Sequence, residues 1–236
     1  MKVDYYTWLS GSLQTEFEDL KLLKQSERGS VHLIRHKESG QNFVLRRFLG
    51  NAEVYRKLLS CECPQLPKIY ETASLNDRNL VLEEYIQGDN MGEMLKGALF
   101  SSDETRHILR DLCQGLWVLH SMGAVHRDIK PENIVLRGQN AVLIDFDAAR
   151  VYKASENGDT QILGTTGFAA PEQYGLSQSD ARSDIYSLGI LINVMRTGEH
   201  PSRHLAEGTW GRIVTRCTQV NPSKRYQTVL RLWEAL

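Results

Sequence analysis

The sequence predicts an α+β chain with two lobes, a small antiparallel β lobe that carries one helix and a larger, mainly helical lobe. Short β-rich apolar runs fill the first third, helical periodicity dominates the remainder, and a polar stretch separates them. The chain has 236 residues, 41% of them apolar and 24% charged, which is enough to bury a substantial core. We expect one domain over 1–236, with a small lobe at about 17–87 and a large lobe at about 91–236.

The small lobe is predicted from three short apolar runs, at 31–34, 42–48 and 79–85, with turn residues between them. One helical run begins at Ala52 and must end before Pro64, because proline cannot continue a helix. This pattern is typical of a twisted antiparallel sheet interrupted by a single helix.

The large lobe is predicted from two helical patterns that follow the polar segment at 87–90. The first runs over 104–123, where apolar residues recur at helix spacing and Gly123 provides a stop. The second, over 184–198, is apolar nearly all round, which indicates a helix buried inside the lobe.

Composition restricts the class of function. The net charge of −1 gives no reason to expect nucleic acid as a partner, and the four cysteines match neither a zinc pattern nor a disulfide scaffold. No run reaches the roughly 18 apolar residues of a membrane span, and the start lacks a signal-peptide core. We therefore expect a cytoplasmic chain without a membrane segment.

Three motifs follow one another in the large lobe: HRDIKPEN at 126–133, AVLIDFDAAR at 141–150 and LGTTGFAAPEQY at 163–174. The first places an acid, a cation and an amide on one loop, and the second ends an apolar strand on Asp145. With these motifs the chain resembles eukaryotic-type (Hanks-type) serine/threonine protein kinases, from about residue 20 to 236. Its short loops suggest a bacterial member. The resemblance implies a bilobal protein-kinase-like fold.

The resemblance also implies the catalytic roles. Asp128 would orient the substrate hydroxyl and accept its proton, while Lys130 would neutralise the transferring phosphoryl group. Asn133 and Asp145 would hold Mg²⁺, and Thr165 would bond to Asp128 and Lys130. The implied cofactors are ATP and Mg²⁺, and the implied partner is a protein with a serine or threonine hydroxyl.

Further residues match structural positions of the family. Glu172 would pair with Arg225, and Asp184 would brace the backbone of the catalytic loop, although a helix N-cap is its alternative interpretation. Asp147 replaces the glycine of the family's Asp-Phe-Gly pattern, which should stiffen the backbone there.

Strand alternation and the resemblance together predict the nucleotide site. Glu84 and Ile86 would contribute backbone groups at a hinge of about 84–90, and Glu83 would lie behind the adenine in the gatekeeper position. The glycine-rich loop is degenerate. The remaining expected nucleotide contacts come from this loop and from apolar positions around the adenine: Ser26, Gly29, Val31, Val44 and Val135.

Arg46 aligns with the strand lysine that holds phosphates in this family, and Glu53 is its expected partner on the helix. The exchange is not conservative, because a guanidinium is wider than an ammonium. A misplacement of about 1 Å can cost on the order of a hundredfold in rate, or roughly 2.7 kcal/mol. We therefore expect an active or weakly active kinase.

Two alternatives stay open. A pseudokinase that binds nucleotide or acts as a scaffold is favoured by Arg46, Asp147 and the degenerate glycine loop. A small-molecule phosphotransferase is disfavoured by the AAPE segment and Arg225, which in protein kinases build a shelf for peptides.

Regulation is expected at the activation segment. Arg127, beside Asp128, is the cation around which a phosphorylated segment would order, with Thr160 the first candidate site and Ser155 the second. Phosphorylation of one copy by another, in a dimer, is compatible with this expectation.

Overall fold

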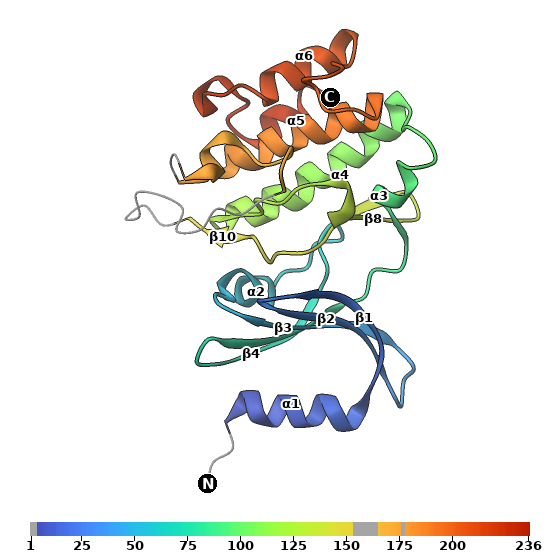
Figure 1. Cartoon of the computed structure of the whole chain (residues 1–236), viewed down its shortest axis with the longest axis vertical. Coiled ribbons are helices and arrows are strands. Elements are labelled where there is room, and N and C mark those ends of the chain that lie inside the picture. Colours follow the sequence, from blue (N-terminus) through green and yellow to red (C-terminus); the bar gives the residue numbers. More distant parts are fainter. Residues whose placement is uncertain (1–3, 153–164, 176–177) are drawn as a thin grey trace. The chain divides into compact units, whose positions relative to one another are not determined.

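The computed structural model describes residues 4–152, 165–175 and 178–236, and the chain divides into two compact units (Figure 1). Unit 1 comprises Met1–Cys63 and Pro67–Ile86, and unit 2 comprises Pro64–Leu66 and Gln87–Leu236. Apart from the short Pro64–Leu66 stretch, the division falls between Ile86 and Gln87, within the stretch predicted to be a hinge. The predicted α+β class is confirmed, with an antiparallel sheet in unit 1 and helices dominating unit 2.

Unit 1 is built on a five-stranded antiparallel sheet with the strand order β1-β2-β3-β5-β4. The three predicted runs became β2, β3 and β5. The other two strands were not singled out in the sequence, and β1 is largely exposed, so it lacks a clear alternation. The strands are β1 (Phe17–Ser26), β2 (Gly29–His36), β3 (Asn42–Leu49), β4 (Ile69–Leu75) and β5 (Arg78–Glu84).

The register of β3 and β5 sorts their side chains onto two faces. Leu45 lies opposite Leu82, whereas Val44 lies opposite Glu83. Because successive side chains of a strand point to opposite faces, Arg46 shares the second face with Val44 and Glu83. One face of the sheet is therefore apolar, and the other carries two buried charged residues, Arg46 and Glu83.

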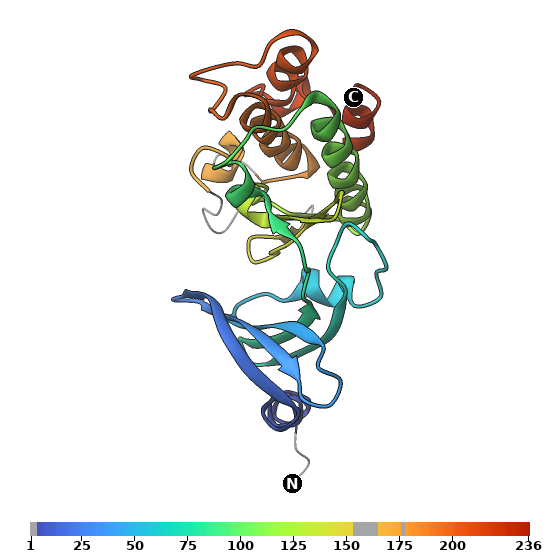
Figure 2. The ribbon, with the colours of Figure 1, turned by 90° about the vertical axis from the view of Figure 1, so that its right-hand side faces the viewer.

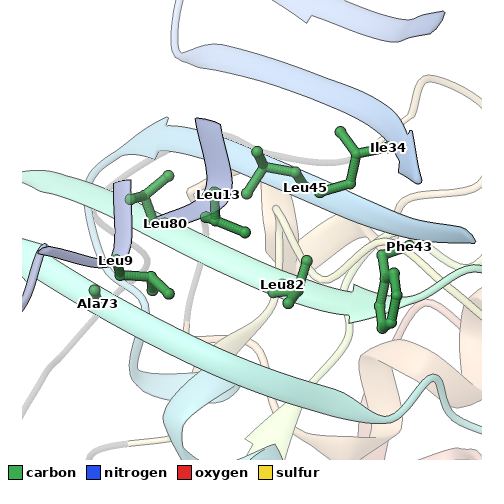
Figure 3. Close-up of a cluster of buried hydrophobic side chains, with 8 residues drawn as sticks. All are labelled: Leu9, Leu13, Ile34, Phe43, Leu45, Ala73, Leu80 and Leu82. Carbon is green, nitrogen blue, oxygen red and sulfur yellow. The ribbon is translucent and has the colours of Figure 1, made fainter. Parts of the chain in front are cut away.

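Helix α1 (Tyr5–Glu16) packs on the apolar face, as Figures 1 and 3 show. Leu9 and Leu13, one helical turn apart, enter a buried cluster contributed by four strands, and Asp4 caps the helix by accepting the Thr7 N–H at 2.9 Å. The cluster contains Leu9, Leu13, Ile34, Phe43, Leu45, Ala73, Leu80 and Leu82.

One helix was predicted in this lobe, but within its described residues unit 1 has two, α1 and α2 (Glu53–Leu58). Helix α1 went unpredicted because only two of its positions are buried, and exposed Tyr5 and Trp8 blur the periodicity. Helix α2 begins where expected. Its Tyr55 ring lies 5.5 Å from the ring of Phe48, on the face that also carries Arg46.

Unit 2 combines helices with short strand pairs (Figure 2). Strand β8 pairs with β6 and β9, and β10 pairs with β7. Its helices are α3 (Met91–Met94), α4 (Ser102–Ser121), α5 (Ala181–Thr197), α6 (Gly208–Cys217) and α7 (Val229–Trp233). Its strands are β6 (Asp89–Asn90), β7 (Ala124–Val125), β8 (Ile134–Arg137), β9 (Asn140–Leu143) and β10 (Arg150–Val151).

Helices α4 and α5 confirm the two helical predictions. The loops that carry the three motifs lie between these helices in the chain. Helix α4 opens on a capping box between Ser101 and Glu104 and is followed by Gly123, whose φ of 73° favours glycine. Helix α5 is buried on nearly every side. Among the described residues, no helix has both the length and the apolar character needed to cross a membrane.

Candidate active site

The predicted catalytic loop (residues 126–133), between β7 and β8, places an acid and a cation beside the hydroxyl of Thr165. The Thr165 hydroxyl donates to Asp128 Oδ1 at 2.7 Å and accepts from Lys130 Nζ at 2.6 Å. The ammonium of Lys130 also lies 2.9 Å from Asp128 Oδ2. The structure thus brings together three residues that the sequence predicted to meet, although Thr165 is 37 positions from Asp128.

Asn133 fixes the Asp128 carboxylate from its other side. It ends the 3₁₀ turn Pro131–Asn133, and its Nδ2 donates to the backbone oxygen of Asp128 at 2.8 Å and to Oδ2 at 2.9 Å. Since the amide nitrogen faces Asp128, the amide oxygen is the atom suited to bind a cation.

The electrostatic surroundings keep Asp128 ionised. Burial by itself would raise the pKa of this carboxyl, but hydrogen bonds from Thr165 and Lys130, together with the charge of Lys130, hold it below its ordinary value. A carboxylate in this state accepts hydrogen bonds only, which suits a group that orients a hydroxyl.

Asp184 braces the loop from within helix α5. Its Oδ1 accepts the Arg127 N–H at 2.8 Å, and its Oδ2 accepts the His126 N–H at 2.9 Å. Arg127 has a φ of 69°, a conformation that a side chain makes costly and that neighbouring bonds must hold in place. The N-cap of α5 is Asp180, so Asp184 serves the loop and is not the helix cap.

His120, on helix α4, is a third partner of Asp184, with Nε2 2.8 Å from Oδ2. Burial would raise the pKa of Asp184, yet the His120 hydrogen bond and the nearby histidines lower it, so the carboxylate is charged. Sequence reasoning missed His120. Nothing local marks it, because it lies 64 positions from Asp184.

His126, the first residue of the loop, is fully buried and its ring is neutral. Burial lowers its pKa more than the nearby carboxylates Asp184, Asp128 and Asp145 raise it. Its Nε2 lies 3.3 Å from the Ile144 carbonyl oxygen, and its Nδ1 accepts the Asp128 N–H at 3.4 Å. The proton is therefore assigned to Nε2.

Asp145 follows strand β9 in a left-handed backbone conformation, with a φ of 69°. The Ile144 N–H donates to the Asn133 carbonyl at 2.9 Å, which ties this segment to the catalytic loop. The Asp147 N–H lies 3.3 Å from Asp145 Oδ1. Asp147 itself avoids positive φ, so aspartate in place of glycine causes no backbone strain in this conformation.

The donor set fits Mg²⁺. Asp145 offers a carboxylate and Asn133 an amide oxygen, and Mg²⁺ in such sites takes one or two protein carboxylates along with phosphate and water oxygens. In the described ranges, no group of three or more His, Cys, Asp or Glu residues could hold a metal by itself.

A buried ion pair anchors the segment after Thr165. Arg225 donates from Nη1 and Nη2 to the two carboxylate oxygens of Glu172, at 2.6 and 2.9 Å, as the sequence predicted. The Ser183 hydroxyl adds a bond of 2.7 Å to Glu172 Oε1. The pKa of Glu172 is lowered, because these hydrogen bonds outweigh the effect of burial.

Gln173 is a second residue that sequence reasoning missed. Its Nε2 donates to the Arg127 carbonyl at 2.8 Å, and its Oε1 accepts the Ala170 N–H at 3.0 Å. Gln173 thereby links the AAPE segment (residues 169–172) to the loop at 126–133. Its place directly after Glu172 was the available signal, since a side-chain amide that becomes buried is expected to hydrogen-bond.

Arg46 of unit 1, which we expect to bind phosphate, contacts an unexpected partner, Glu83. Arg46 Nε lies 2.7 Å from Glu83 Oε1, and the side chains are only 6% and 4% exposed. The expected partner, Glu53, opens helix α2, where its N–H bonds to Asn51 Oδ1 at 2.7 Å. The carboxylate that contacts Arg46 Nε thus belongs to the neighbouring strand β5.

The other expected nucleotide residues of unit 1, except Ile86, lie in the same sheet. Ser26 and Gly29 pair at the β1–β2 turn, and Val31 lies opposite Arg46. A Cβ on Gly29 would come within 1.9 Å of the Arg47 carbonyl oxygen, so this position requires glycine. The Glu84 N–H donates to the backbone oxygen of Lys68 at 2.8 Å.

Val44 is buried on the face that carries Arg46, and Ile86 is buried at the end of unit 1. Val135 lies in unit 2, on strand β8, where it pairs with Asn90 and is buried. The candidate regulatory residues Thr160 and Ser155 lie outside the described residues.

Comparison with known proteins gives a consistent result. The model of the protein kinase domain family matches residues 17–231. Serine/threonine-protein kinase D of Synechocystis sp. is 31% identical over 196 residues, covering 73% of this chain and 38% of that protein. PknA of Nostoc sp. is 32% identical over 218 residues, covering 82% and 38%, and PknB of Mycolicibacterium smegmatis is 30% identical over 201 residues, covering 72% and 32%.

The chain belongs to the protein kinase family, as a Hanks-type serine/threonine protein kinase catalytic domain. It spans about a third of the length of these curated relatives.

Proposed function

We propose that this chain transfers the γ-phosphoryl group of ATP to serine and threonine hydroxyls of proteins. The observation that carries the proposal is the bonded cluster of Asp128, Lys130, Thr165 and Asn133, which holds an ionised acid and a cation on one loop. Phosphoryl transfer requires mainly positioning and charge stabilisation, and both are provided by this set.

In this proposal Asp128 accepts a hydrogen bond from the substrate hydroxyl and takes up its proton as the new P–O bond forms, while the bond between the γ-phosphorus and its bridging oxygen breaks and ADP leaves. Lys130, already held by Thr165, offsets the negative charge on the moving phosphoryl group. Arg46 binds phosphate oxygens as the counterpart of the family's lysine. Mg²⁺, held by Asp145 and Asn133, would neutralise charge on the phosphates when bound.

The test is the intact mass of the purified chain and of casein after incubation with Mg²⁺ and ATP. We expect added 80-dalton steps with the unaltered chain and with Asp77→Asn, an exposed control, and none with Asp145→Asn. ATP binding without any mass increase on the chain or on casein would contradict the proposal and would indicate a pseudokinase.

Autophosphorylation of the activation segment is the finer part of the proposal, with Thr160 first and Ser155 second, through a transient dimer. Peptide mapping of the phosphorylated chain tests both positions. Phosphate on neither residue, in a chain that modifies casein, would contradict this part alone.

A further inference from the structure

Arg46 and Glu83 form a charged pair within one face of the unit 1 sheet. Arg46 lies opposite Val81, and Glu83 lies opposite Val44, so the two are diagonal neighbours on the paired strands β3 and β5. Diagonal positions are separated by about 7–8 Å, which long side chains can bridge. Here Nε and Oε1 meet at 2.7 Å.

Because the contact is buried, each charge helps to stabilise the other. Both side chains are less than a tenth exposed, so neither charge can rely on bulk water. A buried ion pair is a poor source of stability compared with apolar residues of similar size. Contact through Nε also sets the plane of the guanidinium, because its five N–H donors have a fixed planar geometry.

Accepting the proposed kinase function, we propose that Glu83 is the positioning carboxylate of Arg46, holding the guanidinium in the orientation in which it binds ATP phosphates. The role expected of Glu53 then falls to a residue of the adjacent strand. The β3–β5 register consequently places the carboxylate that contacts Arg46 Nε.

The test is a double-mutant cycle of Glu83→Gln and Arg46→Met, read as the Kd for ATP and as kcat on casein. We expect Glu83→Gln to lose about tenfold or more in kcat/KM for ATP, because a charged hydrogen bond becomes a neutral one. In the Arg46→Met background the same change should have almost no effect, since Glu83 acts through Arg46.

Control variants complete the double-mutant cycle. Glu53→Gln should lose less than Glu83→Gln, and Glu62→Gln, an exposed change in the same unit, should match the unaltered chain. The variant Arg46→Met/Glu83→Leu removes both charges, so that neither is left buried alone, and should bind ATP as Arg46→Met does. Urea unfolding of each variant separates loss of fold from loss of binding.

Three outcomes would overturn the inference: a Glu83→Gln variant within twofold of the unaltered chain, an equal loss in the Arg46→Met background, or higher activity of Glu83→Gln. Higher activity of Glu83→Gln would mean that the ion pair with Glu83 prevents Arg46 from binding the nucleotide. Because the cycle is also read by Kd, it holds even for a chain that binds ATP without transferring phosphate. Failure of the proposed function is thereby distinguishable from failure of this inference.

Discussion

The guanidinium of Arg225 meets both carboxylate oxygens of Glu172, 53 residues earlier in the chain, with neither side chain reaching solvent appreciably. Arg225 also donates to the backbone oxygens of Gln219 and Arg182, at 2.8 and 2.9 Å. All these donors are satisfied inside unit 2, so the pair ties the segment after Thr165 to the end of the lobe.

Breaking this pair should destabilise unit 2. Arg225→Met leaves Glu172 charged and buried, and we expect a loss of about 3–5 kcal/mol in the free energy of unfolding. Urea unfolding followed by circular dichroism measures it. The matched control is Arg231→Met, which breaks the exposed pair with Glu234 and should change stability by less than about 1 kcal/mol. Equal effects of the two changes would contradict the structural role.

Removing the Thr165 hydroxyl should slow phosphoryl transfer. Thr165→Val deletes a donor to Asp128 and an acceptor for Lys130, and hydrogen bonds to charged groups contribute about 1.5–3 kcal/mol. We expect kcat to fall about ten- to a hundredfold, with a much smaller change in KM for ATP. Thr165→Ser keeps the hydroxyl and should retain most of the rate. A Thr165→Val enzyme as fast as Thr165→Ser would show that the cluster does not position Asp128.

The neutral state of His126 should make stability depend on pH. Its pKa in the folded chain is lowered by burial from the ordinary 6.5, so below pH 6.5 the unfolded chain takes up a proton that the folded chain does not. Stability from this group is complete above pH 6.5 and falls with decreasing pH, by up to about 1.4 kcal/mol per pH unit.

Urea unfolding at pH 7.5, 6.5 and 5.5 tests this dependence. The stability advantage of the unaltered chain over His126→Asn should shrink as the pH falls, because asparagine does not titrate. The exposed control His204→Asn should leave the pH dependence unchanged. A constant difference between the chain and His126→Asn across this range would contradict a neutral, buried His126.

Helix α1 should stabilise unit 1 through the apolar face of its sheet. Leu13→Ala removes a side chain that is 4% exposed, and such truncations cost about 2–5 kcal/mol. We expect that loss in urea unfolding, against little change for Gln14→Ala on the exposed side of the same helix. Equal stability of the two variants would show that α1 is not part of the core.

Much of unit 2 could be predicted because its signals are local. Helices α4 and α5 have periodic apolar patterns long enough to identify, and the order of HRDIKPEN, Asp145 and the AAPE segment indicated the family. Asp184 and Arg225 were predicted from motif position, and their contacts with the loop and with Glu172 are confirmed. His120, Ser183 and Gln173 were not, since each acts through a partner that only the folded chain brings near.

By itself, the sequence determined the α+β class with two lobes, because this depends on periodicity along the chain. It also determined the protein kinase family and the expected residues of the loop at 126–133, because the motifs of this chain resemble those of that family. Only the tertiary structure decided that Arg46 meets Glu83 and that α1 covers the sheet. The physical reason is the strand register. A diagonal contact between β3 and β5 joins residues 37 positions apart, and no local pattern specifies which of several buried carboxylates will come within hydrogen-bonding distance.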